Sequence, residues 1–475
     1  MQVKIIIDRL FKSSLFLNLF SVGGASVITK LLSLITLGYP ARILSPEGYG
    51  LVAFGSSVTA YAGIVLLPGI MVWGTRHIAR DRINVGETLV IVNLARLFLA
   101  FIAYAALAAY AIFFLKSPLE RSVVLICGLS VFNSAIMVDW VFNGLELMRI
   151  PAWISVAVSV VNVIALFSFI HTPDDVLLYA LFSPVMGLLT VIISYYLVFR
   201  RNVRFVIPCF ALFKQSLRES IPLGITMSLI IVLHYANNLI VKSYLGAAAL
   251  GVFMAAFSLF EHASTLPNIL GTVFMSRLSR CVVSSRESAI KDAAIYAQLH
   301  MLAAFFVAAF MFIEAPAIIR IIYGVKYSGS AELLRYMAVG VIFNYAICGY
   351  TSCMISFGYD RVMFLVVLVS VIVSVVGGLL LVPRIGATGA AIVIASIDLA
   401  GWLVSLPYYK RAIGSLHLQA WIRPALGGMA IVVASFLLQK TTLLLWLRIF
   451  LCMMFYFIFV AGQIRSSYRQ HLALT

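Results

Sequence analysis

The sequence is poor in charged residues. Only 11% of its 475 residues are charged, against about 25% in soluble domains, whereas 63% are hydrophobic and the mean hydropathy is +1.08. A water-soluble domain cannot bury so large an apolar fraction. Apolar runs of about 20 residues recur along the chain, and each can cross a roughly 30 Å hydrocarbon core as a helix. Because the runs lack the alternation of a membrane β-barrel, the sequence predicts an all-α integral membrane protein.

The sequence also lacks the motifs of nucleotide hydrolysis and of metal-dependent catalysis. No Gly is followed by Lys, which excludes a Walker A loop, and no HExxH or GxSxG pattern is present. The six cysteines form no CxxC pair and lie mostly within apolar runs, so we expect free buried thiols. The outer loops are all short. These absences predict a protein that is not an enzyme and that uses no cofactor and no metal.

Acidic residues are the scarcer charge, at 17 against 34 basic ones, which gives a net charge of +17. There is no soluble basic domain, so we do not expect nucleic acid as a partner. The basic residues lie in short loops between spans and mostly on one side, as the positive-inside rule describes. Both termini are therefore expected in the cytoplasm. Membrane lipids are expected as partners, and the basic residues would also attract an anionic substrate.

The apolar runs divide into fourteen predicted spans. The longest inner loop, about 200–221, separates six of them from eight. We therefore expect an N-lobe over 1–210, a C-lobe over 211–412, and two extra helices with a cytoplasmic tail over 413–475. The spans are expected at about 14–38, 48–73, 88–115, 122–145, 150–170, 176–199, 222–245, 250–272, 293–314, 331–357, 362–382, 386–408, 424–439 and 442–463.

A faint repeat crosses the predicted lobe boundary. Leu44–Gly50 lies between the first and second spans, and Leu245–Gly251 lies between the seventh and eighth. Both segments read Leu-x5-Gly at equivalent positions. Six spans per copy keep the two copies in the same orientation, which is the parallel type of internal repeat.

Proline and glycine interrupt three of the predicted spans. Pro68 and Gly69 lie in the second, Pro184 and Gly187 in the sixth, and Pro267 in the eighth. Such interruptions mark places where a transporter bends or binds, or kinks that packing tolerates.

Five ionisable residues lie deep within predicted spans, where a charge costs roughly 2.5–3.5 kcal/mol on insertion scales. They are Lys30, Arg96, His234, Glu261 and Asp398. We expect them to face a cavity, although interhelical hydrogen bonding is the alternative, and Arg96 has a stem long enough to reach the cytoplasmic surface. Three further residues, Lys242, Glu314 and Arg448, lie near span ends and are expected to be interface anchors.

The two lobes differ in the sign of these charges. Lys30 and Arg96 fall in the N-lobe, and we predict that they form a cationic, substrate-binding cavity with His234, suited to a phosphate group. Glu261 and Asp398 fall in the C-lobe. A buried carboxylate can take up and release a proton, so these acids are predicted to serve in ion coupling and gating.

The stretch VDWVFNGLE ends the fourth predicted span. Asp139, Asn143 and Glu146 have the spacing of one helix face, and Trp140 is typical of an interfacial anchor. We expect this segment to form the polar cytoplasmic mouth of the span, with Asp139 at the inner gate. An ordinary helix-end anchor is the alternative.

Four segments resemble a known family, the polysaccharide transporters that act as flippases of O-antigen and other lipid-linked repeat units. ARILSPEGYG (41–50) resembles their ARxLGPEGYG signature, with Ser45 in place of Gly. DWVFNGLELMR (139–149) resembles DWLFQGLExM. IIYGVKYSGSAELLRYMA (321–338) and LVPRIGATGAAIV (381–393) resemble two further family segments. The order and spacing of all four agree over most of residues 20–410.

The resemblance implies the fold of the superfamily that includes the multidrug exporters and the lipid II flippase, with two six-helix lobes around a central cavity. It implies a flippase that moves undecaprenyl-pyrophosphate-linked oligosaccharides across the inner membrane by alternating access, driven by an ion gradient. A polysaccharide polymerase and a chain-length regulator would be its partners. Family members often carry an acid in the seventh span, where this chain reads HYANNLIVK, so coupling here would use Glu261 or Asp398.

Three other functions are open to this sequence. A drug or small-molecule exporter of the same fold is the main alternative. A membrane-embedded polysaccharide polymerase would need a sizeable periplasmic loop, which the chain lacks. A structural scaffold would have no use for Lys30, Glu261 or Asp398 within the membrane.

Overall fold

A computed structural model describes residues 14–81, 84–200, 206, 210–359, 361–414, 419–438 and 454. Within these residues the chain is almost wholly helical and contains no β-strand. Ten of the described helical segments are long and apolar enough to cross a membrane. The prediction of an all-α, multi-pass membrane protein is therefore confirmed, whereas the fourteenth predicted span, 442–463, falls almost wholly outside the described residues.

The chain divides into two compact units, Met1–Gly251 and Val252–Thr475. The boundary between these two units falls within a helix. The predicted lobes, with boundaries after residues 210 and 412, concern the transport path and stay a prediction.

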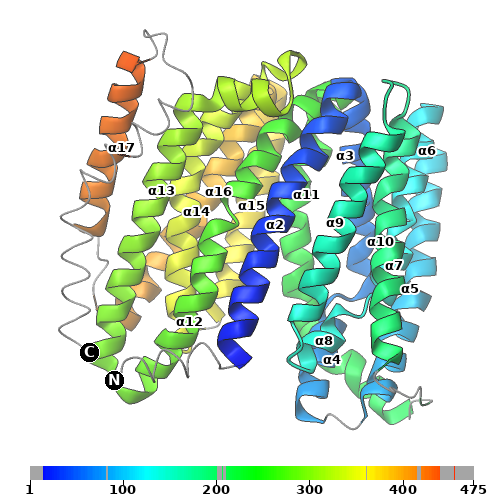
Figure 1. The fold of residues 1–475 in the computed structure, drawn as a ribbon, viewed down its shortest axis with the longest axis horizontal. Coiled ribbons are helices and arrows are strands. Elements are labelled where there is room, and N and C mark those ends of the chain that lie inside the picture. Colours follow the sequence, from blue (N-terminus) through cyan, green and yellow to red (C-terminus); the bar gives the residue numbers. More distant parts are fainter. Residues whose placement is uncertain are drawn as a thin grey trace. The chain divides into compact units, whose positions relative to one another are not determined.

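Within the described residues, the first unit is built from helices that run from Ser14 to the middle of one long helix (Figure 1). Helices α2 and α9 pack together, as do α3 and α6, and α5 packs against α7. Its elements are α2 (Ser14–Ile43), α3 (Pro46–Ala62), η1 (Gly63–Leu66), α4 (Gly69–Arg80), α5 (Val85–Phe114), α6 (Pro118–Gly128), α7 (Ser130–Ile136), α8 (Asp139–Gly144), α9 (Arg149–Phe169), α10 (Val176–Phe199) and the first part of α11 (Phe210–Ala263).

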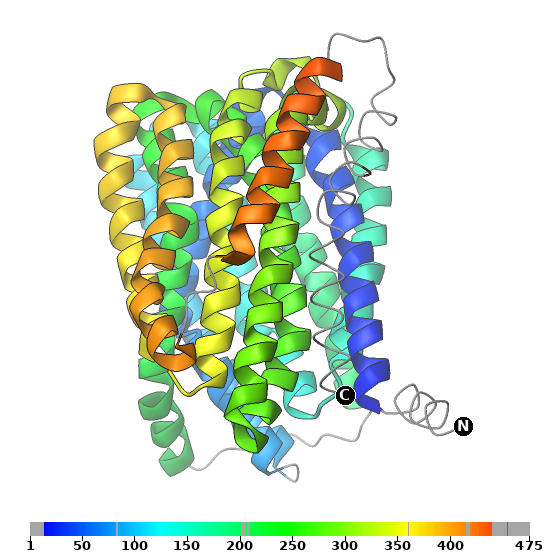
Figure 2. The ribbon, with the colours of Figure 1, turned by 90° about the vertical axis from the view of Figure 1, so that its left-hand side faces the viewer.

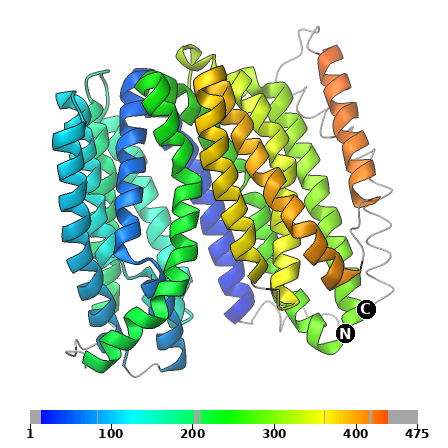
Figure 3. The ribbon, with the colours of Figure 1, turned by 180° about the vertical axis from the view of Figure 1, so that it is seen from behind.

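In the part of the second unit that the structure describes, the end of α11 is followed by six further α-helices. Helices α13, α14 and α16 form its centre, α15 packs against α16 (Figure 3), and α17 lies along α13 (Figure 2). Its other elements are α12 (Leu266–Ser284), α13 (Arg286–Ile322), η2 (Val325–Tyr327), α14 (Ser330–Ser356), α15 (Arg361–Ile385), α16 (Ala387–Ile413) and α17 (Gln419–Leu438).

Several predicted spans are interrupted helices. The second span breaks into α3, η1 and α4, with Leu67 in the left-handed region at φ 51°, immediately before Pro68. The fourth span breaks twice, into α6, α7 and α8. Residues 264–265 separate α11 from α12, which begins one residue before Pro267. In contrast, α10 continues through Pro184.

The two copies of the Leu-x5-Gly repeat pack against each other within the first unit. A Cβ atom added to Gly50 would lie 1.9 Å from the carbonyl oxygen of Ala247, and one added to Gly251 would lie 2.0 Å from that of Pro46. These distances place the start of α3 in backbone contact with α11. Gly246, with φ 86°, bends α11 at the same place. Glycine is needed at both crossing points because any side chain would separate the helices.

The VDWVFNGLE segment differs from its prediction. Helix α8 ends at Gly144 and Glu146 has φ 61°, so Glu146 does not share a helix face with Asp139. Trp140 is not an interfacial anchor, because it is 2% exposed and its indole nitrogen donates to the carbonyl of Met137 at 3.0 Å. The ring packs over Gly74, where an added Cβ would approach it to 2.6 Å. Short-range spacing did not reveal the turn that ends α8.

Candidate functional site

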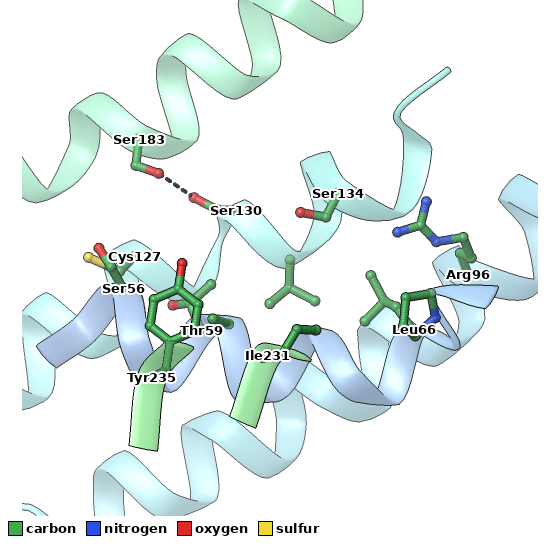
Figure 4. Close-up of a pocket in the computed structure, with 14 residues that line it drawn as sticks. Ser56, Thr59, Leu66, Arg96, Cys127, Ser130, Ser134, Ser183, Ile231 and Tyr235 are labelled. Carbon is green, nitrogen blue, oxygen red and sulfur yellow. Dashed lines mark hydrogen bonds between the residues drawn. The ribbon is translucent and has the colours of Figure 1, made fainter. Parts of the chain in front are cut away.

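The first unit contains a cavity of about 400 Å³ (Figure 4). Its lining comes from α3, η1, α5, α6, α7, α10 and α11, so helices far apart in the sequence meet there. The lining residues are Ser56, Thr59, Ala60, Gly63, Leu66, Pro68, Arg96, Cys127, Ser130, Val131, Ser134, Ser183, Ile231 and Tyr235.

Hydroxyl groups make up most of the polar lining. Ser130 and Ser183 are hydrogen-bonded to each other at 3.2 Å, which joins α7 to α10. The hydroxyl of Thr59 donates to the carbonyl of Gly55 in its own helix at 2.8 Å, so its lone pairs stay open to further donors. Serine hydroxyls rotate and both donate and accept, so this lining can adapt to a polar ligand.

Arg96 is the only charged residue in the cavity lining. Its side chain is 5% exposed, and its Nε and Nη1 atoms have no hydrogen-bond partner within the described part of the chain. Figure 4 shows the guanidinium at one end of the cavity, near Leu66 and Ser134. An ionised group buried without partners is costly, and arginine stays protonated in proteins. The arrangement therefore calls for an anion with several acceptor oxygens, which a guanidinium binds in a fork.

Helix interruptions make room for this cavity. The second span leaves α-helical geometry at η1, and Gly63, Leu66 and Pro68 there all line the cavity. The break at Leu129 separates α6 from α7 and is followed at once by Ser130. Continuous helices would pack closely at these positions.

The structure separates the other predicted cations from Arg96. Lys30 on α2 and His234 on α11 are both exposed, and neither lines the cavity. Ile231 and Tyr235, which lie one turn before and one residue after His234 on α11, line it instead. The substrate-binding roles of Lys30 and His234 stay predictions.

The predicted acids also lie apart from this cavity. Asp139 is half-buried at the start of α8, with one carboxylate oxygen unpartnered. In the second unit, Glu261 is half-buried near the end of α11, and Asp398 on α16 accepts a hydrogen bond from the amide of Asn344 at 3.3 Å. Their roles in coupling and gating stay predictions.

Two of the three residues expected to be interface anchors are partly or wholly buried instead, and Arg448 lies outside the described residues. Lys242 on α11 forms an ion pair with Glu120 on α6, and the side chains are 19% and 12% exposed. The ammonium also lies 4.4 Å from the ring centroid of Phe54. Glu314 is 6% exposed within α13. Both anchor predictions are wrong, because a residue near a span end can still point toward another helix.

The Lys242–Glu120 pair should show strong coupling in a double-mutant cycle. Lys242→Met and Glu120→Gln each leave one charge partly buried without its partner, and we expect each to cost about 2–3 kcal/mol. The double variant should recover most of that loss, because no lone charge remains. Thermal unfolding of the four purified proteins measures the cycle. Strictly additive losses would contradict the pairing.

The other pocket and the potential metal ligands provide fewer groups that could bind a charged substrate. An apolar groove of about 340 Å³ in the second unit lies among α13, α14 and α17, with Phe305, Phe312 and Met429 in its lining. It has almost no polar atoms with which to recognise a charged group. Within the described residues, no three His, Cys, Asp or Glu side chains cluster as metal ligands, and the four described cysteines are free.

Asp292, which is 5% exposed on α13, and His300 are buried ionisable residues that were not singled out from the sequence. His300 lies on α13 with 0% exposure, inside the predicted span 293–314. A histidine within an apolar run indicates a buried ionisable group, but His300 was not among the residues selected by their depth in a span.

The architecture is that of a known class of membrane transporters. Superposition on the lipid II flippase MurJ in its inward closed conformation gives a TM-score of 0.77, with 14% identity over 94% of this chain and 99% of that one. An outward-facing multidrug resistance MATE family transporter of the MOP superfamily gives 0.56, with 16% identity over 84% and 96% of the two chains. At such identities the likeness shows the fold alone, and this fold agrees with the one that the resemblance implied.

The sequence comparisons define the family. Residues 15–282 match the model of the family described as polysaccharide biosynthesis protein. A Shigella dysenteriae protein described as "Putative O-antigen transporter" is 30% identical over 330 residues, which cover 68% of this chain and 80% of that one. The chain therefore belongs to the polysaccharide biosynthesis protein family, as the resemblance implied. The Shigella relative is described as a transporter, in agreement with the prediction of a protein that is not an enzyme.

Proposed function

We propose that the protein is a flippase that moves undecaprenyl-pyrophosphate-linked oligosaccharide repeat units, of O-antigen or a similar polysaccharide, across the inner membrane by alternating access. Both termini would lie in the cytoplasm. Membrane lipids, a polysaccharide polymerase and a chain-length regulator would be its partners. The description of its Shigella relative supports the substrate class, and its MurJ-like fold supports the mechanism.

The observation that carries this proposal is the unpartnered guanidinium of Arg96 in the hydroxyl-lined cavity. A pyrophosphate offers the acceptor oxygens that the free Nε and Nη1 atoms lack, and hydroxyls such as those of Ser130 and Ser134 can donate to the remaining oxygens. Binding would offset the free-energy cost of burying the charge of Arg96 within the protein.

The size of the cavity limits which part of the substrate it holds. Its volume of about 400 Å³ lies in the range of pockets for one small molecule. A lipid-linked oligosaccharide is far larger. The cavity is therefore proposed to bind the charged group between lipid and sugar, while the prenyl chain stays with the lipid and the sugars occupy the wider transport path.

Ion coupling completes the proposed cycle. Glu261, Asp398 and Asp139 are the acids proposed to take up and release the coupling ion or to gate the path, while Lys30 and His234 would meet the anionic substrate outside the Arg96 cavity. The carboxylate of Asp398 accepts a hydrogen bond from Asn344 on α14, so a change in its charge would change the strength of the contact between α16 and α14.

The decisive experiment locates the lipid-linked repeat unit in cells without the gene. The proposal expects the unit to accumulate on the cytoplasmic leaflet, and the wild-type gene to restore its passage to the periplasmic leaflet. Unchanged passage in the deletion strain contradicts it. An exporter of cationic drugs is the second candidate because the MATE fold is shared, but the Arg96 cavity would repel such substrates. Drug susceptibility of the same strain separates the two functions.

A further inference from the structure

His300 is held between two carbonyl oxygens. Its Nδ1 atom lies 3.1 Å from the carbonyl oxygen of Tyr296, one turn earlier in α13, and its Nε2 atom lies 3.3 Å from that of Pro267 in the first turn of α12. The side chain is completely buried. A neutral imidazole has one N–H and one lone pair, so it can donate to only one of these acceptors. Only the imidazolium, with two N–H groups, donates to both.

Pro267 follows directly on the break between α11 and α12. The backbone there makes only turn-type bonds, from the amide of Ser264 to Phe260 and from that of Thr265 to His262. A second residue secures the other side of the break, because the hydroxyl of Tyr345 on α14 donates to the carbonyl of Ala263 at 3.0 Å. Two neighbouring helices thus reach carbonyl groups beside the break, α14 through a hydrogen bond that does not titrate and α13 through one that depends on a proton. Within the break, the side chains of Thr265 and Asn268 donate to the carbonyls of Glu261 and Ser264.

The surroundings of the ring oppose and favour the charge at once. Burial and the N-terminus of α12 disfavour an imidazolium, whereas the two carbonyl dipoles stabilise it. The titratable groups that face the ring are tyrosines, with Tyr296 edge-on at 4.1 Å from α13 and Tyr345 at 6.4 Å from α14. Cys353 lies in the same buried cluster as Tyr296, and Gly349 gives the ring room on α14. Histidine is the side chain that ordinarily titrates near neutral pH, and only its doubly protonated form can donate to both carbonyl oxygens.

We propose that His300 is a proton-binding site whose protonation state controls the contact between α13 and the break at the start of α12. With the proton bound, Nε2–H donates to Pro267 and the break is held. When Nε2 loses the proton to water, its lone pair faces the oxygen of Pro267, and the contact weakens. In the proposed flippase this makes H⁺ the coupling ion, a role that rests on the proposed function.

The proton site can be tested without transport. Nitrogen NMR of the full-length protein in lipid, with ¹⁵N-labelled histidine, distinguishes imidazolium from neutral imidazole. We expect one histidine signal, absent from His300→Gln, to change from two protonated nitrogens at acid pH to one at alkaline pH. A His300 signal with one protonated nitrogen at every pH overturns the proposal. Should His300→Gln fail to fold, a version in which the remaining six of the seven histidines are Gln identifies the same signal.

Coupling is tested in proteoliposomes with a fluorescent undecaprenyl-pyrophosphate-linked disaccharide. Wild type should flip the probe several-fold faster when a pH gradient is imposed, and His300→Gln should lose that stimulation while keeping the basal rate. Tyr345→Phe is the matched control, because it removes the other hydrogen bond to the break and leaves the imidazole in place. It should keep the response to the gradient. Equal stimulation in wild type and His300→Gln overturns the coupling role.

The two proposals fail in different ways. If wild type does not flip the probe under any gradient, the proposed function is contradicted, and the nitrogen spectra still decide whether His300 binds a proton. If wild type flips the probe at a rate that ignores the pH gradient, the flippase stands and the coupling role of His300 is overturned.

Discussion

Replacing Arg96 with Met should abolish transport while making the protein more stable. The variant loses two charge-assisted hydrogen bonds to the substrate, each worth roughly 1.5–3 kcal/mol, so we expect transport to fall about 100-fold or more. It also removes a buried charge whose Nε and Nη1 atoms have no hydrogen-bond partner among the described residues. That change should raise the free energy of unfolding by about 1–3 kcal/mol. Flipping in proteoliposomes and thermal unfolding in detergent measure the two effects.

Two further variants show what the guanidinium contributes. Arg96→Lys keeps the charge and loses the planar fork, so its transport should lie between wild type and Arg96→Met. Lys116→Met removes an exposed cation between α5 and α6 and should change neither measurement. A destabilised Arg96→Met protein would point to a structural role for the residue. Wild-type transport by that protein would remove Arg96 from the substrate site.

Replacing Gly50 with Ala should destabilise the protein severely. The new methyl group would lie 1.9 Å from the carbonyl oxygen of Ala247 and 2.8 Å from the amide nitrogen of Gly251, so the backbones of α3 and α11 must separate. Overpacking commonly costs about 1–3 kcal/mol, and a backbone obstacle cannot rotate away as a side chain can, so we expect about 3 kcal/mol or more. The yield of monodisperse protein and its thermal unfolding midpoint report the effect.

Gly24→Ala is the matched control for this substitution. Gly24 lies within α2, and a Cβ added there meets nothing within 4 Å. Alanine favours a helix interior over glycine by up to about 1 kcal/mol, so this variant should be as stable as wild type or slightly more so. Equal stability of Gly50→Ala and Gly24→Ala would contradict the backbone contact between the two repeat copies.

The sequence predicted the helices well and their interruptions less well. Hydropathy is a local property, so a window of about 20 residues locates a span whatever lies around it. The break at Pro68 could be expected because proline and glycine mark it in the sequence. The break at Leu129 has only a lone glycine, Gly128, before it, and the break at Met137 has neither proline nor glycine beside it. The left-handed Glu146 could not be expected from its side chain. At these positions tertiary packing decides the backbone conformation.

The candidate site divides in the same way. Depth in a span predicted that Arg96 would matter, and the same criterion selected Lys30 and His234, which the structure leaves exposed and outside the cavity. Depth says how far a residue lies from the membrane surface, whereas the cavity is defined by which face of each helix is turned inward. His300 was missed because its importance depends on two carbonyl oxygens that no sequence pattern records.

By itself, the sequence determined that this is an all-α membrane protein of the polysaccharide biosynthesis protein family, in which the cations that lie deep in predicted spans fall in the first half and the deep acids fall in the second. Composition and motif order suffice for this, because both are read along the chain. Only the tertiary structure decided that Arg96 alone among those cations lines a cavity, that Gly50 meets Gly251, and that His300 lies against the break between α11 and α12. Each of these depends on how helices distant in sequence pack together. Lipid tails are as apolar as the side chains of a membrane helix, so hydrophobicity alone does not decide which face of the helix is turned toward its neighbours.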